Sequence, residues 1–234
     1  MGKKRLKPIR QAQGFYPERN RRIKRGLVIT FEGPEGCGKS THSKLLHKHL
    51  LKSGFDCVFV REPGGTQAGD KIRKILLNTK FKGKNIDTLT ELLLFEASRN
   101  ELIDKVIKPS LKKKKIVLCD RYNDSTIVYQ SLAGGVDTKK ALIVDGIVVG
   151  NVIPDITILI DLNEKLGLKR ACRKRKKDRM ELKSLLFHKK VRKGFLSVAR
   201  KNKKRVCVIK NNASIAELQG RIKDAIDKKV KKII

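Results

Sequence analysis

The amino-acid sequence predicts an α/β fold in which helices cover both faces of a five-stranded parallel sheet. Short apolar runs, each long enough for one strand, alternate along the chain with longer stretches of helical pattern. Strands that alternate with helices form β-α-β crossovers, which place the strands side by side in parallel. At 234 residues, of which 39% are hydrophobic, the chain can build the core of one large domain. We therefore expect a single domain over residues 26–234, after a basic arm over residues 1–25.

The first expected strand, LVITFE, is apolar almost throughout and ends in a glycine-rich turn, as a strand buried on both faces does. In chain order, the expected strands are residues 27–32, 57–60, 116–119, 156–161 and 206–209. The expected helices are residues 39–53, 69–79, 88–108, two between 124 and 150, then 164–175, 181–201 and 214–229. Asp145, Pro154 and Asp155 interrupt the longest apolar stretch, so no membrane-spanning segment is expected.

The chain is strongly basic, with 57 Lys and Arg against 23 Asp and Glu, a formal charge of +34. One interpretation is a lysine-rich composition with the charges on solvated faces. The other is a site for polyanions such as nucleic acid or phosphorylated ligands. Residues 1–25 alone hold ten basic residues and one acid without apolar periodicity, which predicts a disordered arm. Its composition is compatible with a transit peptide or a nucleic-acid contact, and we expect it to be dispensable for catalysis.

The five cysteines, an odd number, are scattered along the chain and form no C-x-x-C pair. This pattern argues against a zinc site and against a disulfide framework, and it suits a reducing environment. The basic N-terminus is not followed by the hydrophobic core of a signal peptide. We therefore expect a cytoplasmic protein.

The motif GPEGCGKS, residues 33–40, follows the first expected strand and matches G-x-x-x-x-G-K-[ST]. Its glycines let the backbone turn N–H groups toward phosphate oxygens, and the helix that begins at Lys39 presents its positive end to the same anion. Lys39 adds a charge for the β- and γ-phosphates, and the Ser40 hydroxyl can bind Mg²⁺. The motif therefore predicts an ATP site. The residues expected to bind ATP are Gly33, Pro34, Glu35, Gly36, Cys37, Gly38, Lys39, Ser40 and Thr41, joined by Arg170 from later in the chain.

A second part of this site is expected where the third strand ends. In IVLCDRY, Asp120 suits a carboxylate that positions Mg²⁺ and its waters, and Arg121 can reach a phosphate. The N-K-x-D element of guanine-specific GTPases is missing, because Asn202–Lys203 continues into further basic residues. The small size of the chain then favours a kinase over a motor ATPase with additional domains.

Residues 170–181, RACRKRKKDRME, carry seven basic residues among the first eleven. One interpretation is a solvated, mobile linker. The other is a lid that closes over phosphate-bearing ligands, because so many like charges repel one another unless an anion neutralises them.

Six segments together resemble thymidylate kinase over about residues 27–229: ITFEGPEGCGKST, REPGGT, LLLFEASRNELI, VLCDRYNDSTIVYQ, PDITILIDLN, and DRME with FHKKVRKGF. The resemblance implies a three-layer P-loop kinase fold with a basic lid. It also implies the reaction ATP + dTMP → ADP + dTDP, a requirement for Mg²⁺, and a homodimer.

The resemblance assigns the acceptor nucleotide to three segments of the chain. It places Arg61 on the dTMP phosphate and makes the Glu62–Pro63 bond cis, so that Pro63 shapes a fixed turn. It stacks Phe95 on the thymine ring, directs Arg99 to a thymine carbonyl, and assigns Gln130 to the N3 edge of the base.

The sugar is assigned in the same way. Tyr129 would crowd the 2′ carbon and so favour deoxyribose, with Ser125 and Thr126 on the same wall. Glu35 would neighbour the sugar 3′-hydroxyl and the acceptor phosphate.

The catalytic arginines resemble those of the bacterial type, in which the lid supplies the arginine that the phosphate-binding loop lacks. The lid offers Arg170, Arg173, Arg175 and Arg179. The residues expected to act in catalysis are Lys39, Arg121, Arg173 and Arg175. The acceptor phosphate is already ionised near pH 7, so positioning and charge neutralisation would carry the reaction.

Two segments depart from the family pattern. The arginine that usually follows Gln130 is missing, because SLAGGVD stands there. The usual asparagine before the fourth strand is also missing, with VDGIVVGNVI in its place around Asp145. Three other functions stay open on the sequence alone: a nucleic-acid-stimulated P-loop ATPase, a nucleoside monophosphate kinase of other base specificity, and a catalytically silent homologue.

Overall fold

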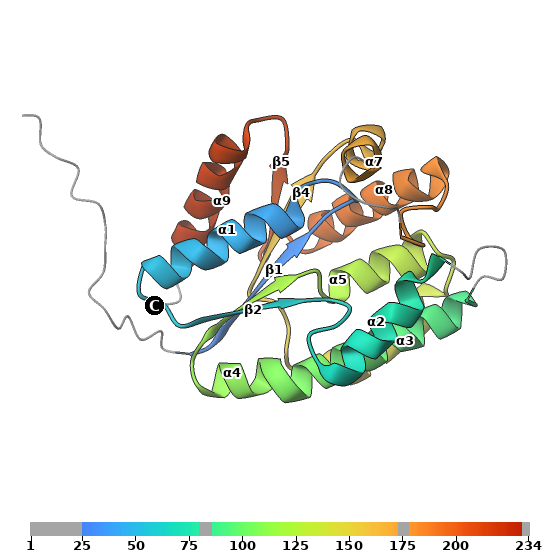
Figure 1. Cartoon of the computed structure of the whole chain (residues 1–234), viewed down its shortest axis with the longest axis horizontal. Coiled ribbons are helices and arrows are strands. Elements are labelled where there is room, and N and C mark those ends of the chain that lie inside the picture. The colour runs from blue at the N-terminus through green and yellow to red at the C-terminus, as the bar shows by residue number, and fades with distance from the viewer. Residues whose placement is uncertain (1–24, 80–85, 173–177, 231–234) are drawn as a thin grey trace, which may run out of the picture.

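The computed structural model describes residues 25–79, 86–172 and 178–230, and it confirms the α/β fold (Figure 1). All neighbouring strands are parallel, in the spatial order β2-β3-β1-β4-β5. The strands are β1 (Leu27–Glu32), β2 (Cys57–Arg61), β3 (Ile116–Asp120), β4 (Ile156–Asp161) and β5 (Val206–Lys210). The basic arm predicted for residues 1–25 lies, except for Arg25, outside the described residues.

The strand order places the candidate site at one edge of the sheet. β1 is the central strand, and the chain leaves it toward both sides, so a crevice opens beyond the carboxyl ends of β1 and its neighbours. Phe31 of β1 lies opposite Asp120 of β3, which is in turn opposite Arg61 of β2. The parallel register therefore brings together groups that are far apart in the sequence.

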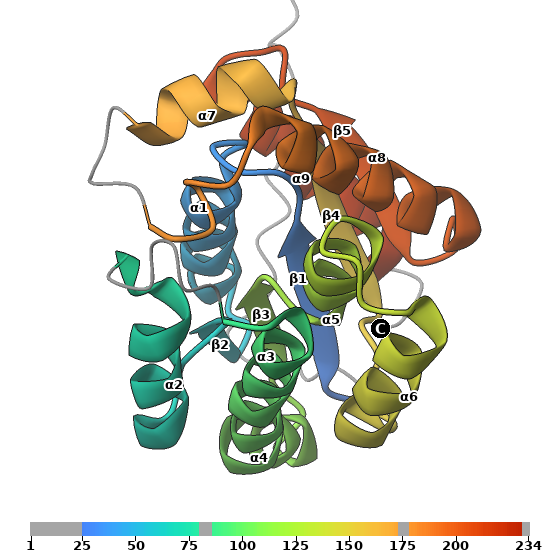
Figure 2. The ribbon, with the colours of Figure 1, turned by 90° about the vertical axis from the view of Figure 1, so that its right-hand side faces the viewer.

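Helices cover both faces of the sheet, as Figures 1 and 2 show. On one face, Leu46 of α1 and Ile222 of α9 pack against β1, β3 and β4. On the other face, Leu102 and Ile107 pack against Val28 and Val117. The helices are α1 (Lys39–Lys52), α2 (Gln67–Leu77), α3 (Thr88–Leu102), α4 (Lys108–Lys112), α5 (Asn123–Thr126), α6 (Thr138–Val149), α7 (Glu164–Cys172), α8 (Leu185–Lys201) and α9 (Ile215–Val230), with π-helical segments η2 (Ile103–Ile107) and η3 (Ile127–Leu132).

The largest differences from the prediction within the described residues lie at two helix boundaries, and the other compared helix ends differ by at most two residues. The helix expected over 88–108 continues to Lys112, through the π-helical segment η2. The helix expected over 181–201 begins only at Leu185, because the Ser184 hydroxyl caps it by accepting a hydrogen bond from the Phe187 N–H. Before this cap, the Asp178 carboxylate accepts from the N–H groups of Met180 and Glu181 and so holds a turn.

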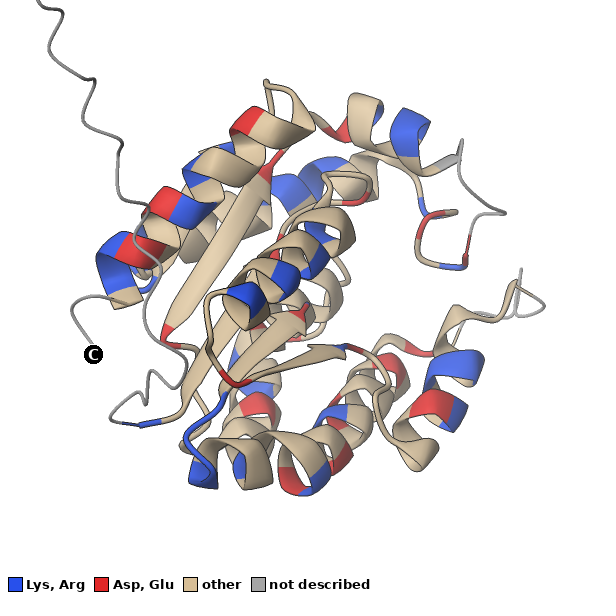
Figure 3. Cartoon of the chain, turned by 60° about the vertical axis from the view of Figure 1, so that its left-hand side comes forward, with Lys and Arg blue, Asp and Glu red and all other residues tan. Residues whose placement is uncertain are grey.

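Basic side chains are spread over the outer helices, while the strands are mostly uncharged (Figure 3). Across the described residues, no helix combines the length and apolarity that crossing a membrane demands.

The first turns of α7 lie directly against the phosphate-binding loop. A Cβ atom on Gly167 would lie 2.2 Å from the carbonyl oxygen of Glu35, and a Cβ atom on Gly36 would lie 1.9 Å from the carbonyl oxygen of Gly167. Two backbones can approach this closely only where neither residue has a side chain. The contact therefore fixes the start of the lid segment to the phosphate-binding loop.

We predict opposite effects of alanine at two helical glycines. Gly167→Ala should lower the free energy of unfolding by about 1–3 kcal/mol, because the added methyl group collides with backbone. Gly220→Ala in α9, where a Cβ atom would meet nothing within 4 Å, should raise it by about 0.4–1 kcal/mol. Urea unfolding midpoints measure both, and a Gly167→Ala protein as stable as the wild type would contradict the close contact.

Candidate active site

The loop between β1 and α1 is a preformed anion site. Gly36 (φ 65°) and Gly38 (φ 100°) adopt the left-handed conformation that turns the backbone around the site. Lys39 is buried, and its ammonium group donates to the carbonyl oxygens of Gly33 at 2.9 Å and Pro34 at 2.8 Å. These bonds hold the ammonium group at the N-terminal end of α1, where the free backbone N–H groups already favour an anion.

Arg121 joins this loop to the end of β3. Its guanidinium forms an ion pair with Glu35 at 2.6 Å and lies over the Tyr129 ring, 5.0 Å from the ring centre. The Tyr129 hydroxyl donates to the same Glu35 oxygen at 2.9 Å. Burial by itself would raise the pKa of Glu35, but the charges of Arg121 and Lys39 outweigh it and lower this pKa to about 2. Glu35 is therefore a permanent anion that holds Arg121 at the site.

Glu32, the last residue of β1, fixes the turn that carries Arg121. Its buried carboxylate accepts from the Tyr122 N–H at 2.8 Å, from the Ser125 N–H at 3.3 Å and from the Ser125 hydroxyl at 2.6 Å. Arg121 has a φ of 73°, a conformation that costs free energy for a residue with a side chain. Burial, followed by the negative charge of Asp124, raises the pKa of Glu32 to about 7.

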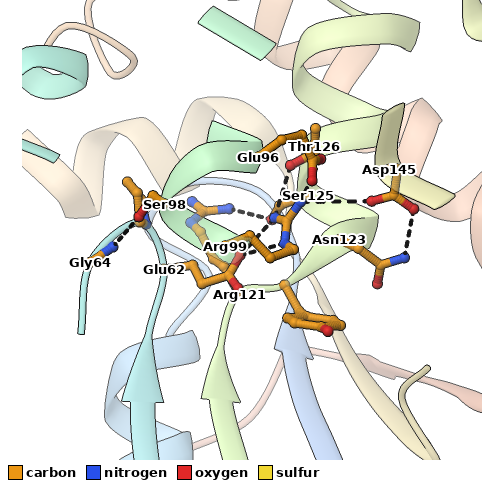
Figure 4. Close-up of polar contacts among 12 residues, drawn as sticks. Glu62, Gly64, Glu96, Ser98, Arg99, Arg121, Asn123, Ser125, Thr126 and Asp145 are labelled. Carbon is orange, nitrogen blue, oxygen red and sulfur yellow. Dashed lines mark hydrogen bonds and ion pairs between the residues drawn. The ribbon is translucent and has the colours of Figure 1, made fainter. Parts of the chain in front are cut away.

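Arg99 is the centre of a second buried cluster (Figure 4). It donates to Glu62 at 2.6 and 2.9 Å, to Glu96 at 2.6 Å and to the Thr126 hydroxyl at 2.9 Å, with Asp145 at 3.7 Å. Three carboxyl groups thus share one cation. Burial, partly offset by Arg99, raises the pKa of Glu62 to about 7 and that of Asp145 to about 6.

The partners of Arg99 limit what it can offer to a ligand. Each of its three guanidinium nitrogens already contacts a carboxylate. A thymine carbonyl would have to share or displace one of these bonds. Asp145, one member of this cluster, lies in the segment that departs from the family pattern. The side-chain nitrogen of Asn123 donates a hydrogen bond to it at 3.2 Å.

A third buried contact connects Gln130 to Arg179, near the end of the lid segment. The Gln130 side-chain nitrogen donates to Glu91 at 2.8 Å, and the other Glu91 oxygen forms an ion pair with Arg179 at 2.5 Å. Arg179, expected among the lid arginines that meet the phosphates, is instead buried and also donates to the Leu76 carbonyl at 2.8 Å. It is not among the residues that line the cavity described next.

A cavity of about 1040 Å³ joins these clusters to the phosphate-binding loop. It brings together most of the residues that the sequence predicted for the site. Those that line it are Glu35, Gly36, Gly38, Lys39, Ser40, Thr41, Arg61, Pro63, Phe95, Arg99, Asp120, Arg121, Ser125, Thr126, Tyr129, Gln130 and Arg170.

The remaining predicted site residues lie elsewhere. Gly33, Pro34 and Cys37 belong to the phosphate-binding loop but are buried behind the cavity wall. Arg173 and Arg175 lie outside the described residues. The Glu62–Pro63 peptide bond is cis, as the resemblance implied.

Sequence reasoning missed one side of the cavity, which is formed by residues that follow β5. Asn211 lines the cavity, and its side chain donates to the Cys37 carbonyl at 2.9 Å, so it ties this segment to the phosphate-binding loop. Ala213 and Ile215 line the same wall. The available signal was position, since the carboxyl ends of all parallel strands lie at the same edge of the sheet.

The oxygen atoms that the protein offers fit a magnesium ion whose other ligands are waters and substrate phosphates. Ser40 and the buried Asp120 both line the cavity and supply one hydroxyl and one carboxylate. Mg²⁺ keeps several waters and usually takes one or two carboxylates together with substrate phosphates. Consistently, the described residues contain no cluster of three or more His, Cys, Asp or Glu that would form a complete protein cage.

Comparison with known proteins decides the family. The thymidylate kinase family model matches residues 31–222. The chain belongs to the thymidylate kinase family. It is 44% identical to a thymidylate kinase of Dehalococcoides mccartyi, over 86% of this chain and 95% of the relative, and 41% identical to that of Kosmotoga olearia, over 84% and 93%. A crystal structure of thymidylate kinase from Ehrlichia chaffeensis superposes with a TM-score of 0.68 at 35% identity, covering 86% of this chain and 98% of that chain.

We predict that Glu32 makes the stability of this kinase fall as the pH rises from about 4.5 to 7. Over this interval the folded protein holds a proton on Glu32 that the unfolded chain has released, so this contribution is complete below pH 4.5 and lost above 7. Glu32→Gln should remove a slope of about 1.4 kcal/mol per pH unit from the wild-type curve. Urea unfolding at several pH values measures this slope. If the free energies of unfolding of the two proteins depended on pH in the same way between pH 4.5 and 7, the predicted role of Glu32 would be wrong.

Proposed function

We propose that the single cavity holds ATP at the phosphate-binding loop and dTMP between α3 and the Arg121 segment, with the transferred phosphoryl group between them. The chain is a nucleoside monophosphate kinase, and the reaction is ATP + dTMP → ADP + dTDP. One observation carries the assignment: a single cavity is lined by Lys39 and Ser40 as well as by Phe95 and Gln130. Arg121 lines it too and contacts both Glu35 of the phosphate-binding loop and Ser125. Family membership gives no support to a nucleic-acid-stimulated ATPase.

On the donor side, Lys39 and the N–H groups of the loop would bind the ATP phosphates. Ser40 and Asp120 would hold Mg²⁺, which supplies charge neutralisation to the transferring phosphoryl group. Arg170, exposed one turn after the Gly167 contact, lines the cavity and would add a positive charge there. Residues after β5, including Asn211, would form the wall beside the donor nucleotide.

On the acceptor side, the half-buried Phe95 would stack on the base. Arg61 is exposed, lines the cavity and has no carboxylate partner within the described part of the chain, so it is available to the dTMP phosphate. Tyr129 is held in place by its bond to Glu35 and would narrow the space beside the sugar.

The proposed mechanism relies on positioning and charge. The acceptor phosphate oxygen is already ionised near pH 7, so no side chain has to remove a proton. Arg121 lines the cavity beside the phosphate-binding loop and would neutralise the approaching phosphates, while Glu35 keeps its guanidinium from moving away. In related phosphoryl transfers one well-placed arginine contributes about 10³–10⁵ in rate. The catalytic roles of Arg173 and Arg175 stay predictions.

We predict that acceptor-dependent release of ADP with ATP and Mg²⁺ is fastest with dTMP, weaker with dUMP and negligible with UMP. Phe95→Ala should lower kcat/KM for dTMP roughly 10- to 100-fold through loss of stacking, with little change in KM for ATP. A coupled ADP assay over dTMP, dUMP, dCMP, dGMP, dAMP and UMP measures both. ATP turnover that depends on nucleic acid and not on a nucleotide acceptor would refute the proposal.

We also propose that the enzyme is a homodimer that pairs through α6. This helix exposes a row of large apolar side chains: Leu142 is 52% exposed, Ile143 63% and Ile147 77%, and Ile153 just beyond the helix is 61% exposed. Leu89 and Leu93 of the neighbouring α3 are also exposed. Exposed apolar side chains of this size on two adjacent helices fit a second copy of the chain. The predicted cytoplasmic location agrees with free thiols at Cys37, Cys57, Cys119 and Cys207.

We predict that Ile147→Glu yields a monomer, because two copies of the charge would be buried at the symmetric contact. Ile215→Glu provides the matched control, since Ile215 is 61% exposed on α9, away from α6. Sedimentation velocity at micromolar concentration distinguishes the two states. A dimeric Ile147→Glu protein would place the interface elsewhere.

A further inference from the structure

Three buried side chains form a relay, one ion pair followed by one hydrogen bond, that leads from the end of the lid segment to the base pocket. Arg179 contacts one Glu91 oxygen at 2.5 Å, and the other Glu91 oxygen accepts from the Gln130 amide nitrogen at 2.8 Å. Glu91 and Gln130 are 1% exposed and Arg179 is 7% exposed. Lys183 lies 3.9 Å from Glu91, so two cations face this carboxylate. The relay is held in place at its Arg179 end, because Arg179 also donates to the Leu76 carbonyl.

Chemistry fixes the direction of the hydrogen bond between Gln130 and Glu91. A guanidinium can only donate, and an ionised carboxylate can only accept. The Gln130 amide could in principle present either its oxygen or its nitrogen to a neighbour, but only the nitrogen can bond to Glu91. Glu91 therefore determines the orientation of the Gln130 amide.

The orientation leaves the Gln130 carbonyl oxygen for the cavity. Within the described residues, the bond to Glu91 is the one hydrogen bond of this side chain. The oxygen is not among the enclosed polar atoms left without a partner, and Gln130 lines the cavity near Phe95 and Arg99. With the Arg99 nitrogens bound to carboxylates, the pocket offers the base edge a fixed hydrogen-bond acceptor.

We infer that Glu91 is a specificity-determining positioning residue, which makes the site select bases that carry a hydrogen-bond donor at N3. Thymine and uracil have N3–H, whereas the N3 of cytosine is an acceptor and would face the Gln130 oxygen without a proton between them. With cytosine, N3 and the Gln130 oxygen are both acceptors, so no hydrogen bond forms between them and both groups are left unpaired. This inference rests on the proposed function, because it takes the acceptor base to lie beside Phe95 and Gln130.

Glu91→Gln should reverse the relay. Arg179 can only donate, so it holds the oxygen of the new amide and directs the amide nitrogen toward Gln130. Gln130 must then turn its own oxygen to this donor and present its nitrogen to the base. The pocket becomes a donor, which suits cytosine and opposes thymine and uracil.

The test measures kcat/KM for dTMP, dUMP and dCMP with wild-type enzyme and with Glu91→Gln. In the variant, kcat/KM for dTMP should fall roughly 10- to 100-fold, and the ratio of dTMP to dCMP should fall at least tenfold. The ratio of dTMP to dUMP should not change, because both bases carry N3–H. A general loss of structure would lower kcat/KM for all three substrates by the same factor and leave these ratios unchanged.

Two control variants separate orientation from packing. Glu91→Asp keeps an acceptor-only group and should keep the ratio of dTMP to dCMP, even if the rate falls. Asp155→Asn makes the same carboxylate-to-amide change at the other end of the sheet, where Asp155 pairs with Arg25 and accepts a hydrogen bond from the Val28 N–H. This variant should leave kcat/KM unchanged for all three substrates.

An unchanged ratio of dTMP to dCMP in folded Glu91→Gln would overturn the inference, as would an equal shift in Glu91→Asp. A wild-type enzyme without dTMP activity would instead overturn the proposed function. Should Glu91→Gln not fold, dTMP methylated at N3 provides a second test, since it lacks the donor. Wild-type enzyme should bind it at least tenfold more weakly than dTMP, and equal binding would refute the role of the Gln130 oxygen.

Discussion

Two arginines organise the site, Arg99 fully buried and Arg121 partly buried, and the carboxylates that hold them come from distant parts of the chain. Glu35 of the phosphate-binding loop holds Arg121, and Glu62 after β2 holds Arg99 together with Glu96. Removing one partner of a buried ion pair typically costs about 3–5 kcal/mol, because the remaining charge is left unpaired. These ion pairs therefore fix the walls of the cavity as firmly as the apolar core fixes the sheet.

The two ends of the cavity have opposite electrostatic character. At the phosphate end, Lys39, the loop N–H groups and Arg121 gather positive charge, balanced only in part by Glu35. At the base end, Glu62, Glu96 and Asp145 share the single cation Arg99, and burial raises the pKa of Glu62 and Asp145. In the proposed binding mode, the positive phosphate end would attract the anionic phosphates and so orient a nucleotide along the cavity.

The lid segment is connected to the body of the enzyme at both of its ends. Before it, the backbone contact between Gly36 and Gly167 fixes α7 to the phosphate-binding loop. After it, Arg179 is buried against Glu91 and the Leu76 carbonyl. One end therefore lies against the phosphate-binding loop, and the other contacts Glu91, the residue that we propose orients Gln130.

The sequence by itself determined the five strands, their parallel arrangement and the phosphate-binding motif, because these depend on local patterns: apolar runs, helical periodicity and glycine spacing. Resemblance also named most of the cavity wall, from Arg61 to Gln130. The direction of each charged side chain was decided only in the tertiary structure. Arg179 looks like its neighbours in a basic run, yet it is buried, because Glu91 and Leu76 offer partners from helices far away in the chain. Which arginine of a basic run forms an ion pair depends on which carboxylates the fold brings near it. A sequence pattern does not contain that information.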